Sequence, residues 1–473
     1  MIAWGGAPAL SPRLAAHLRT LAASGGLAVL GLLVAAATRG PYVRDVVAFA
    51  AGVALIGVFA RLPALLLPST VLWLTALGTV RRLVTEAGSS SRLDPLLLVG
   101  PLALALLTVE AARRGAFGTR TPLGKAVFAL SALVVIGAGN PRSGHFFTGV
   151  SSLLFVLVPL LGYWIGRALD DRGLWRVLRL VAGLGVAAAA YGLVQTLAGF
   201  PSWDETWIGQ VSLNSLNVGG AVRPFASFSS ASEYAVYLGV GIVIWLALAT
   251  RLRSLPLALL ALAVLVPALV LESSRGTAVL TLVAAGLILG ARRRLPLLPA
   301  AAFGVLLLAG LTIALRSYAS APAATSVGPR ALVTHEVTGL SQPLNAQNST
   351  LNAHWSLIVA GVKSAIKDPI GRGTAAVTIA GATFGGKRFG TEADPSNMAV
   401  ALGLPGLVAY LAIVALGLKL VYERARQRAD VLALAALGVV VVTFLQWLNG
   451  GLYAVAFLPW LVFGWADRTP SSR

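Results

Sequence analysis

The chain of 473 residues contains no cysteine, which excludes disulfides, thiolate catalysis and zinc–thiolate sites. Charged residues make up only 11% of it, against about 25% in an average soluble protein. No acidic residue falls in the middle of an apolar run, and the two halves show no repeat. Both absences disfavour an ion-coupled transporter. A histidine-rich metal site is not expected either, because the four histidines are scattered, at His17, His145, His335 and His354.

Long apolar runs dominate what is present. Hydrophobic residues make up 57% of the chain, and each run is near the length that spans about 30 Å of hydrocarbon. The pattern predicts an all-α, polytopic integral membrane protein with 12–14 transmembrane helices and one long, partly helical loop on the outer face. The first run lacks a signal-peptide cleavage site, so we expect it to be retained. The fourteen candidate runs are 23–38, 46–60, 62–80, 95–112, 125–139, 146–167, 179–199, 232–250, 255–271, 276–291, 295–315, 397–418, 431–447 and 451–466.

The net charge of +20 is explained by membrane orientation better than by nucleic-acid binding. With both termini in the cytoplasm, the inside carries 22 Lys/Arg and 6 Asp/Glu, and the outside 15 and 11. The net charges are then +16 and +4, as the positive-inside rule requires. The loop with Arg81, Arg82 and Arg92 falls outside and breaks this rule.

The chain divides into four parts by this reading. N-terminal membrane helices occupy 1–178, and a membrane core with functional outer loops occupies 179–316. An extracytoplasmic loop follows at 317–395, and C-terminal membrane helices occupy 396–473.

Arg223 and Arg275 lie in short polar turns that the alternation of runs places on the outer side. An arginine kept near hydrocarbon is a candidate functional residue, and its guanidinium can grip a phosphate with two hydrogen bonds. The pair therefore predicts a site for a phosphate-bearing, lipid-borne substrate. Alternatively, Arg223 anchors at a lipid headgroup, Arg275 snorkels from a hairpin, and the nearby Trp and Phe residues form an aromatic belt.

The long outer loop contains an amphipathic pattern. Trp355, Ile358, Val362 and Ile366 recur at helical spacing and predict a helix on the outer surface, which Pro369 and the glycines after it end. His354 lies in its first turn, either as a polar-face residue or as a catalyst.

A charged cluster precedes the next apolar run. It contains Lys387, Arg388, Glu392 and Asp394. A carboxylate there could serve as a general base toward a sugar hydroxyl, and the alternative is a solvated charged turn.

Taken in order, these motifs resemble the O-antigen ligase/O-antigen polymerase superfamily over roughly residues 180–420. The resemblance is carried by Arg223-Pro-Phe-Ala-Ser-Phe, Ser274-Arg275-Gly276, the Trp355 helix, Asp368-Pro369-Ile-Gly371-Arg-Gly373 and Leu402-Gly403-Leu-Pro-Gly406. It implies a GT-C-like fold in a bacterial inner (cytoplasmic) membrane. It also implies a metal-independent, inverting glycosyltransferase without a cofactor, acting in cell-envelope polysaccharide or lipopolysaccharide synthesis.

By this resemblance, the donor is a glycan on a polyprenyl (undecaprenyl) diphosphate carrier, the acceptor is a glycan or a lipid-linked molecule, and no nucleic acid is involved. Arg223 and Arg275, with Lys387 and Arg388, would bind the diphosphate, and Arg275 would also act in catalysis. The family's histidine before the post-loop helix is absent here. Either Glu392 replaces it, or His354 reaches the site, or the activity differs.

Three functions follow in order of preference. The first is a polymerase that joins lipid-linked repeat units, and the second is a ligase that moves finished polymer to a lipid, protein or wall acceptor. The third is a lipid-linked oligosaccharide flippase, which needs a polar route through the bilayer that the surface-clustered charges do not suggest.

Overall fold

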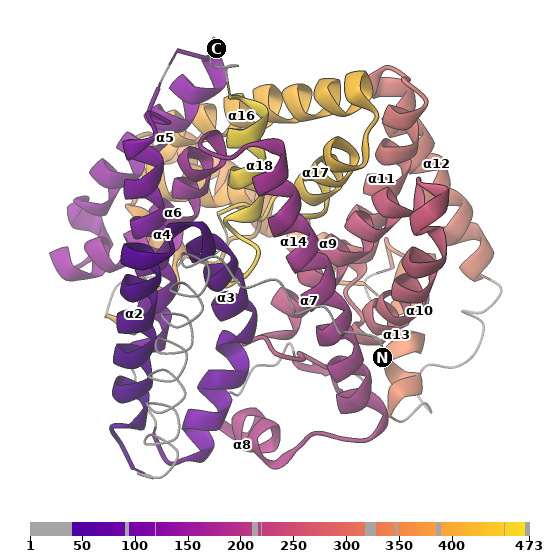
Figure 1. Ribbon diagram of the computed structural model, residues 1–473, viewed down its shortest axis with the longest axis horizontal. Coiled ribbons are helices and arrows are strands. Elements are labelled where there is room, and N and C mark those ends of the chain that lie inside the picture. The colour runs from indigo at the N-terminus through magenta and orange to yellow at the C-terminus, as the bar shows by residue number, and fades with distance from the viewer. Residues whose placement is uncertain are drawn as a thin grey trace, which may run out of the picture.

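A computed structural model describes residues 40–89, 94–118, 120–210, 216–218, 220–316, 328–345, 349–384, 389–448 and 450–468 (Figure 1). Within these residues, nine helices are long and apolar enough to cross a membrane, and three shorter apolar helices accompany them. The strands in the described part are one two-residue pair, β1 (Asn217–Val218) and β2 (Ala221–Val222). The chain is thus an all-α, multi-pass membrane protein, while the figure of 12–14 spans stays a prediction. The run at 23–38 lies outside the described residues.

The first half is a series of upright helices joined by short connections. The predicted runs at 46–60 and 62–80 are two separate helices, because Pro63 begins a new helix directly after Leu62. The elements are α2 (Val43–Arg61), α3 (Pro63–Glu86), α4 (Leu96–Arg113), α5 (Pro122–Ala138), η1 (Pro141–Ser143), α6 (Phe146–Arg167) and α7 (Asp171–Leu197).

The second half contains the remaining spans and the helices of the outer loop. The predicted loop is partly helical, as expected, with α13, α14 and α15 inside it. The elements are α8 (Ser202–Gln210), α9 (Ala231–Ala249), η3 (Leu252–Ser254), α10 (Leu255–Glu272), α11 (Arg275–Arg292), α12 (Leu297–Arg316), α13 (Pro329–Ser341), α14 (Leu351–Lys367), η5 (Thr374–Val377), α15 (Ile379–Thr383), α16 (Asp394–Arg428), α17 (Val431–Val442) and α18 (Leu458–Ala466).

Polar contacts define the two ends of the bundle. At one end, Asp94 bridges Arg44 at the start of α2 and Arg81 near the end of α3, at 2.8 and 2.6 Å. At the opposite end, Asp171 pairs with Arg428 and Arg468 at 2.9 and 2.6 Å. The helices therefore alternate in direction as the sequence predicts. We call the end that carries Asp94 the site end; in Figure 1 it is the lower end, where α8 lies. Its assignment to the outer face of a membrane stays a prediction.

The last two predicted spans, 431–447 and 451–466, are wrong in extent. The helices α17 and α18 are short, and the chain between them, 443–457, is turns rather than helix over its described residues. Such backbone is tolerated at membrane depth only where its polar groups are satisfied inside the protein. Two buried carboxylates do this: Glu233 accepts from the Ala454 N–H at 2.7 Å, and Asp394 from the Leu448 N–H at 3.1 Å.

The core lies around α9 and α17. All twelve residues of α17 are buried, and most of α9 is too. A helix that is apolar on every side belongs in the interior of a bundle. Trp447, Trp460 and Phe463 close the core beside these helices in edge-to-face contacts.

Candidate functional site

Arg223 is held against the end of α10. It follows β2, and its backbone N–H donates to the Leu216 carbonyl at 2.7 Å. Its guanidinium donates to the backbone carbonyl of Glu272 at 2.8 Å and forms an ion pair with the Glu272 carboxylate, which is fully buried. Arg223, which the sequence predicts to bind a phosphate, is therefore already paired with an acidic side chain of the same protein.

Arg275 begins α11 in the turn that follows Glu272. Ser273 makes this turn possible by adopting a left-handed conformation, with φ 62° and ψ 41°. The Arg275 guanidinium donates to the His335 carbonyl at 2.9 Å. It also lies where a side chain on Gly339 of α13 would have to go, so a larger residue at this position would displace the guanidinium.

The helix α13 brings two titratable groups to the arginines. His335 Nδ1 lies 2.8 Å from Ser273 Oγ. Burial and the positive charges of Arg275 and Arg223 lower the pKa of His335 to about 4, so its imidazole is neutral at physiological pH. Glu336 is buried, and its Oε2 is without a hydrogen-bond partner among the described residues.

Burial raises the pKa of Glu336 to about 7, although both arginines pull it down. The group formed by Arg223, Glu272, Arg275, His335 and Glu336, here called the arginine cluster, thus has one carboxyl group that is close to half ionised at neutral pH. When Glu336 is protonated or displaced, the cluster has an excess of positive charge and suits an anion.

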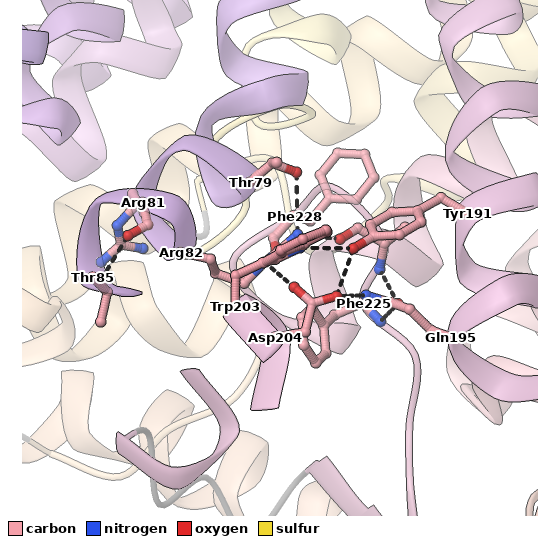
Figure 2. Close-up of polar contacts among 11 residues, drawn as sticks. Thr79, Arg81, Arg82, Thr85, Tyr191, Gln195, Trp203, Asp204, Phe225 and Phe228 are labelled. Carbon is pink, nitrogen blue, oxygen red and sulfur yellow. Dashed lines mark hydrogen bonds and ion pairs between the residues drawn. The ribbon is translucent and has the colours of Figure 1, made fainter. Parts of the chain in front are cut away.

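A buried polar network holds the segment after Arg223 in place (Figure 2). Asp204 of α8 pairs with Arg82 at 2.6 Å, and both side chains are fully buried. Gln195 donates to Asp204 at 2.7 Å and accepts from the backbone N–H groups of Phe225 and Ala226 at 3.1 and 2.8 Å. Because these bonds fix the backbone at 225 and 226, they also fix the position from which Arg223 reaches α10.

The same network neutralises Arg81 and Arg82, the two arginines whose predicted outer position disagrees with the positive-inside rule. Arg82 donates to the carbonyls of Ala226 and Phe228 and pairs with Asp204. Arg81 pairs with Asp94 and donates to Ser229 at 2.9 Å. Arg92 lies outside the described residues.

The two predicted proton acceptors meet at a second place. His354 Nδ1 lies 3.2 Å from Glu392 Oε1, with side chains 52% and 41% exposed. A carboxylate at Nδ1 fixes the imidazole with its Nε2 free to accept a proton. Asp394, two residues on, is excluded from this role because it is buried and bonded to Tyr410 and to the backbone of Leu448.

The residues that the sequence predicts for the site thus fall into two groups in the structure. Arg223 and Arg275 come together, and so do His354 and Glu392, but the described residues contain no hydrogen bond or ion pair between the two groups. Lys387 and Arg388 lie outside the described residues. His335 and Glu336 were missed, since nothing in the local sequence links α13 to a turn 60 residues earlier. Glu272 was visible, as the acidic residue two positions before Ser274-Arg275.

No group of three or more His, Asp or Glu side chains suited to a metal ion occurs in the described part of the chain. Comparison with models of known families and with curated proteins gave no match for this chain.

Proposed function

We propose that this protein is a membrane glycosyltransferase that polymerises or transfers glycan units from a polyprenyl-diphosphate carrier on the outer leaflet. The observation that supports this most is the convergence of Arg223 and Arg275 on one buried turn at the site end. Two guanidiniums at this depth match the two charged groups of a diphosphate at the membrane surface. Two of the motifs that resemble the O-antigen ligase/polymerase superfamily, Arg223-Pro-Phe-Ala-Ser-Phe and Ser274-Arg275-Gly276, contain these arginines. A GT-C-like arrangement with 12–14 spans belongs to this proposal.

In the proposed reaction, an acceptor hydroxyl oxygen attacks the anomeric carbon of the donor glycan. The bond from that carbon to the diphosphate breaks, and the electron pair leaves with the carrier diphosphate. Arg275 and Arg223 stabilise the charge that builds on the leaving oxygen. The hydroxyl proton passes to a base, since the arginines are cations and cannot accept it.

Two imidazoles compete for the role of base. His335 is neutral and lies within the arginine cluster, where the diphosphate would bind. His354 has a carboxylate partner in Glu392, which would orient it and stabilise its protonated form. Proximity to the diphosphate favours His335, but its pKa of about 4 makes it a weak base. The carboxylate partner favours His354 with Glu392.

The interior supports an enzyme over a flippase. A flippase needs a polar route through the bilayer, but α17 at the centre of the described bundle is apolar and buried along its whole length. The charged groups of the arginine cluster instead lie at one end of the helices that carry them. A polymerase and a ligase share this chemistry and differ in the acceptor.

The test is transfer by the purified chain in lipid, with the lipid-linked glycan fraction from source membranes as donor and new glycosidic product measured by mass spectrometry. We expect Arg275→Ala to lower the rate about a hundredfold, or about 3 kcal/mol, and Arg275→Lys to restore little of it. Arg253→Ala, an exposed cation at the opposite end, is the matched control. Near-normal product from Arg275→Ala would contradict the proposal.

The same assay assigns the base. If His335 accepts the proton, His335→Ala loses transfer while His354→Ala and Glu392→Gln retain it. If the exposed pair does, both of its variants fail while donor binding persists. Full activity in all three variants would mean that none of these three side chains is the base.

A further inference from the structure

The helix α14 packs on the bundle with its small residues. Gly361 and Ala365 are buried, and Gly361 lies against Thr391 and Ser396 at the start of α16. The large apolar residues of the same segment are exposed instead. Leu351, Trp355, Ile366 and Ile370 are 47, 63, 80 and 81% exposed.

These four residues form one stripe. Leu351 and Trp355 are one helical turn apart on α14, and Ile366 follows three turns after Trp355, so these three share a helix face. Ile370 lies three residues beyond the last helical residue, Lys367, and extends the exposed apolar surface past the end of the helix. Isolated exposed apolar side chains are ordinary, but a contiguous stripe on a 17-residue amphipathic helix indicates an interaction surface.

The end of the stripe lies beside an exposed apolar face of α16. The Leu404 N–H of α16 donates to the Pro369 carbonyl at 3.0 Å, next to Ile370. Leu404, Val408 and Leu411 are 52, 57 and 47% exposed and lie on one face of this spanning helix. The exposed apolar face of this spanning helix therefore begins next to the segment that ends the stripe.

Two lysines complete the pattern of a membrane-surface helix. Lys363 and Lys367 are exposed on α14. Long cationic side chains beside an apolar stripe can reach phosphate groups while the stripe contacts acyl chains.

We propose that α14 is an interfacial helix whose stripe lies in the lipid of the site-end leaflet, with Lys363 and Lys367 at the anionic phospholipid headgroups. This interaction surface does not depend on the proposed glycosyl transfer. It would also place His354, next to Trp355 in the chain, at headgroup depth, where a lipid-borne molecule presents its polar part.

Because the chain has no cysteine, single cysteines test this directly. An environment-sensitive fluorophore is attached to Trp355→Cys, Ile366→Cys or Ile370→Cys in the full chain. Asn352→Cys and Ser356→Cys, which are exposed beside the stripe, are the matched controls. Each protein is placed in vesicles of phosphatidylcholine and phosphatidylglycerol that carry a spin label at a shallow acyl position.

We expect stripe labels to emit at shorter wavelength than the controls and to be quenched by the spin-labelled lipid about threefold more. Three stripe positions are used so that damage from one substitution does not decide the result. Stripe labels that resemble the controls would overturn the proposal. Labels that are shielded but not quenched would overturn it too, since protein from this chain or a second copy would then cover the stripe.

Discussion

Replacing Glu336 by glutamine should stabilise the protein at alkaline pH and leave it unchanged at acid pH. Burial raises the pKa of this carboxyl from 4.5 to about 7 in the folded state, although the nearby arginines lower it. The folded state therefore binds more protons than the unfolded state between these values, and its stability falls as the pH rises through that window. Above this pH window, the ionised Glu336 lowers the free energy of unfolding by about 3 kcal/mol, since one pKa unit corresponds to about 1.4 kcal/mol. Glutamine keeps the shape of the side chain and cannot ionise.

The measurement is thermal unfolding in detergent, followed by tryptophan fluorescence, at several pH values between about 5 and 8. We expect Glu336→Gln and the native chain to unfold together at the acid end, and the variant to unfold at higher temperature at the alkaline end. Glu205→Gln, which removes an exposed carboxylate of α8, is the control. An equal difference at both ends of the pH range would refute the reasoning, because a contribution that does not titrate cannot arise from ionisation of Glu336.

Two further predictions concern the groups that position the arginines. Gly339→Ala should displace the Arg275 guanidinium from the His335 carbonyl and reduce transfer, although alanine is the better helix former by about 1 kcal/mol. Gly276→Ala, with open space around the added methyl group, is its control, and equal activity of the two variants would contradict the prediction. Asp204→Asn should lower the free energy of unfolding by about 3–5 kcal/mol, because it leaves Arg82 buried without a charged partner. If Asp204→Asn unfolds at the same temperature as the native protein, the Arg82–Asp204 pair does not hold this segment in place. Glu110→Gln, which breaks the exposed pair with Arg114, is the control.

Local signals in the sequence located several elements well. Apolar spacing and the proline after it place α14 at Leu351–Lys367, and the small polar residues after Glu272 mark the turn that begins α11. The break at 443–457 could not be found this way, since its composition is as apolar as a span. It depends on Glu233 and Asp394, which are more than 50 residues away in the chain and which look like ordinary charges at helix ends. The contact of α13 with the arginines is equally non-local.

The pairing of Arg223 with Glu272 changes how the arginines must be tested. Arg223→Ala leaves a fully buried carboxylate without its partner, and such a loss costs about 3–5 kcal/mol whatever the protein does. A missing product would then reflect folding as readily as chemistry. Arg275 has no ion pair within 4 Å among the described residues, so its substitution separates the two effects better. It also follows that a diphosphate cannot bind Arg223 without displacing a group that is already paired with it. It must compete with Glu272 for Arg223 and meet Arg275 beside Glu336, so binding is an exchange of carboxylate for phosphate. In the proposed function, an anion that carries more charge than a carboxylate would win this exchange and a neutral lipid would not, so the proposal predicts that the arginine cluster selects phosphate-bearing molecules.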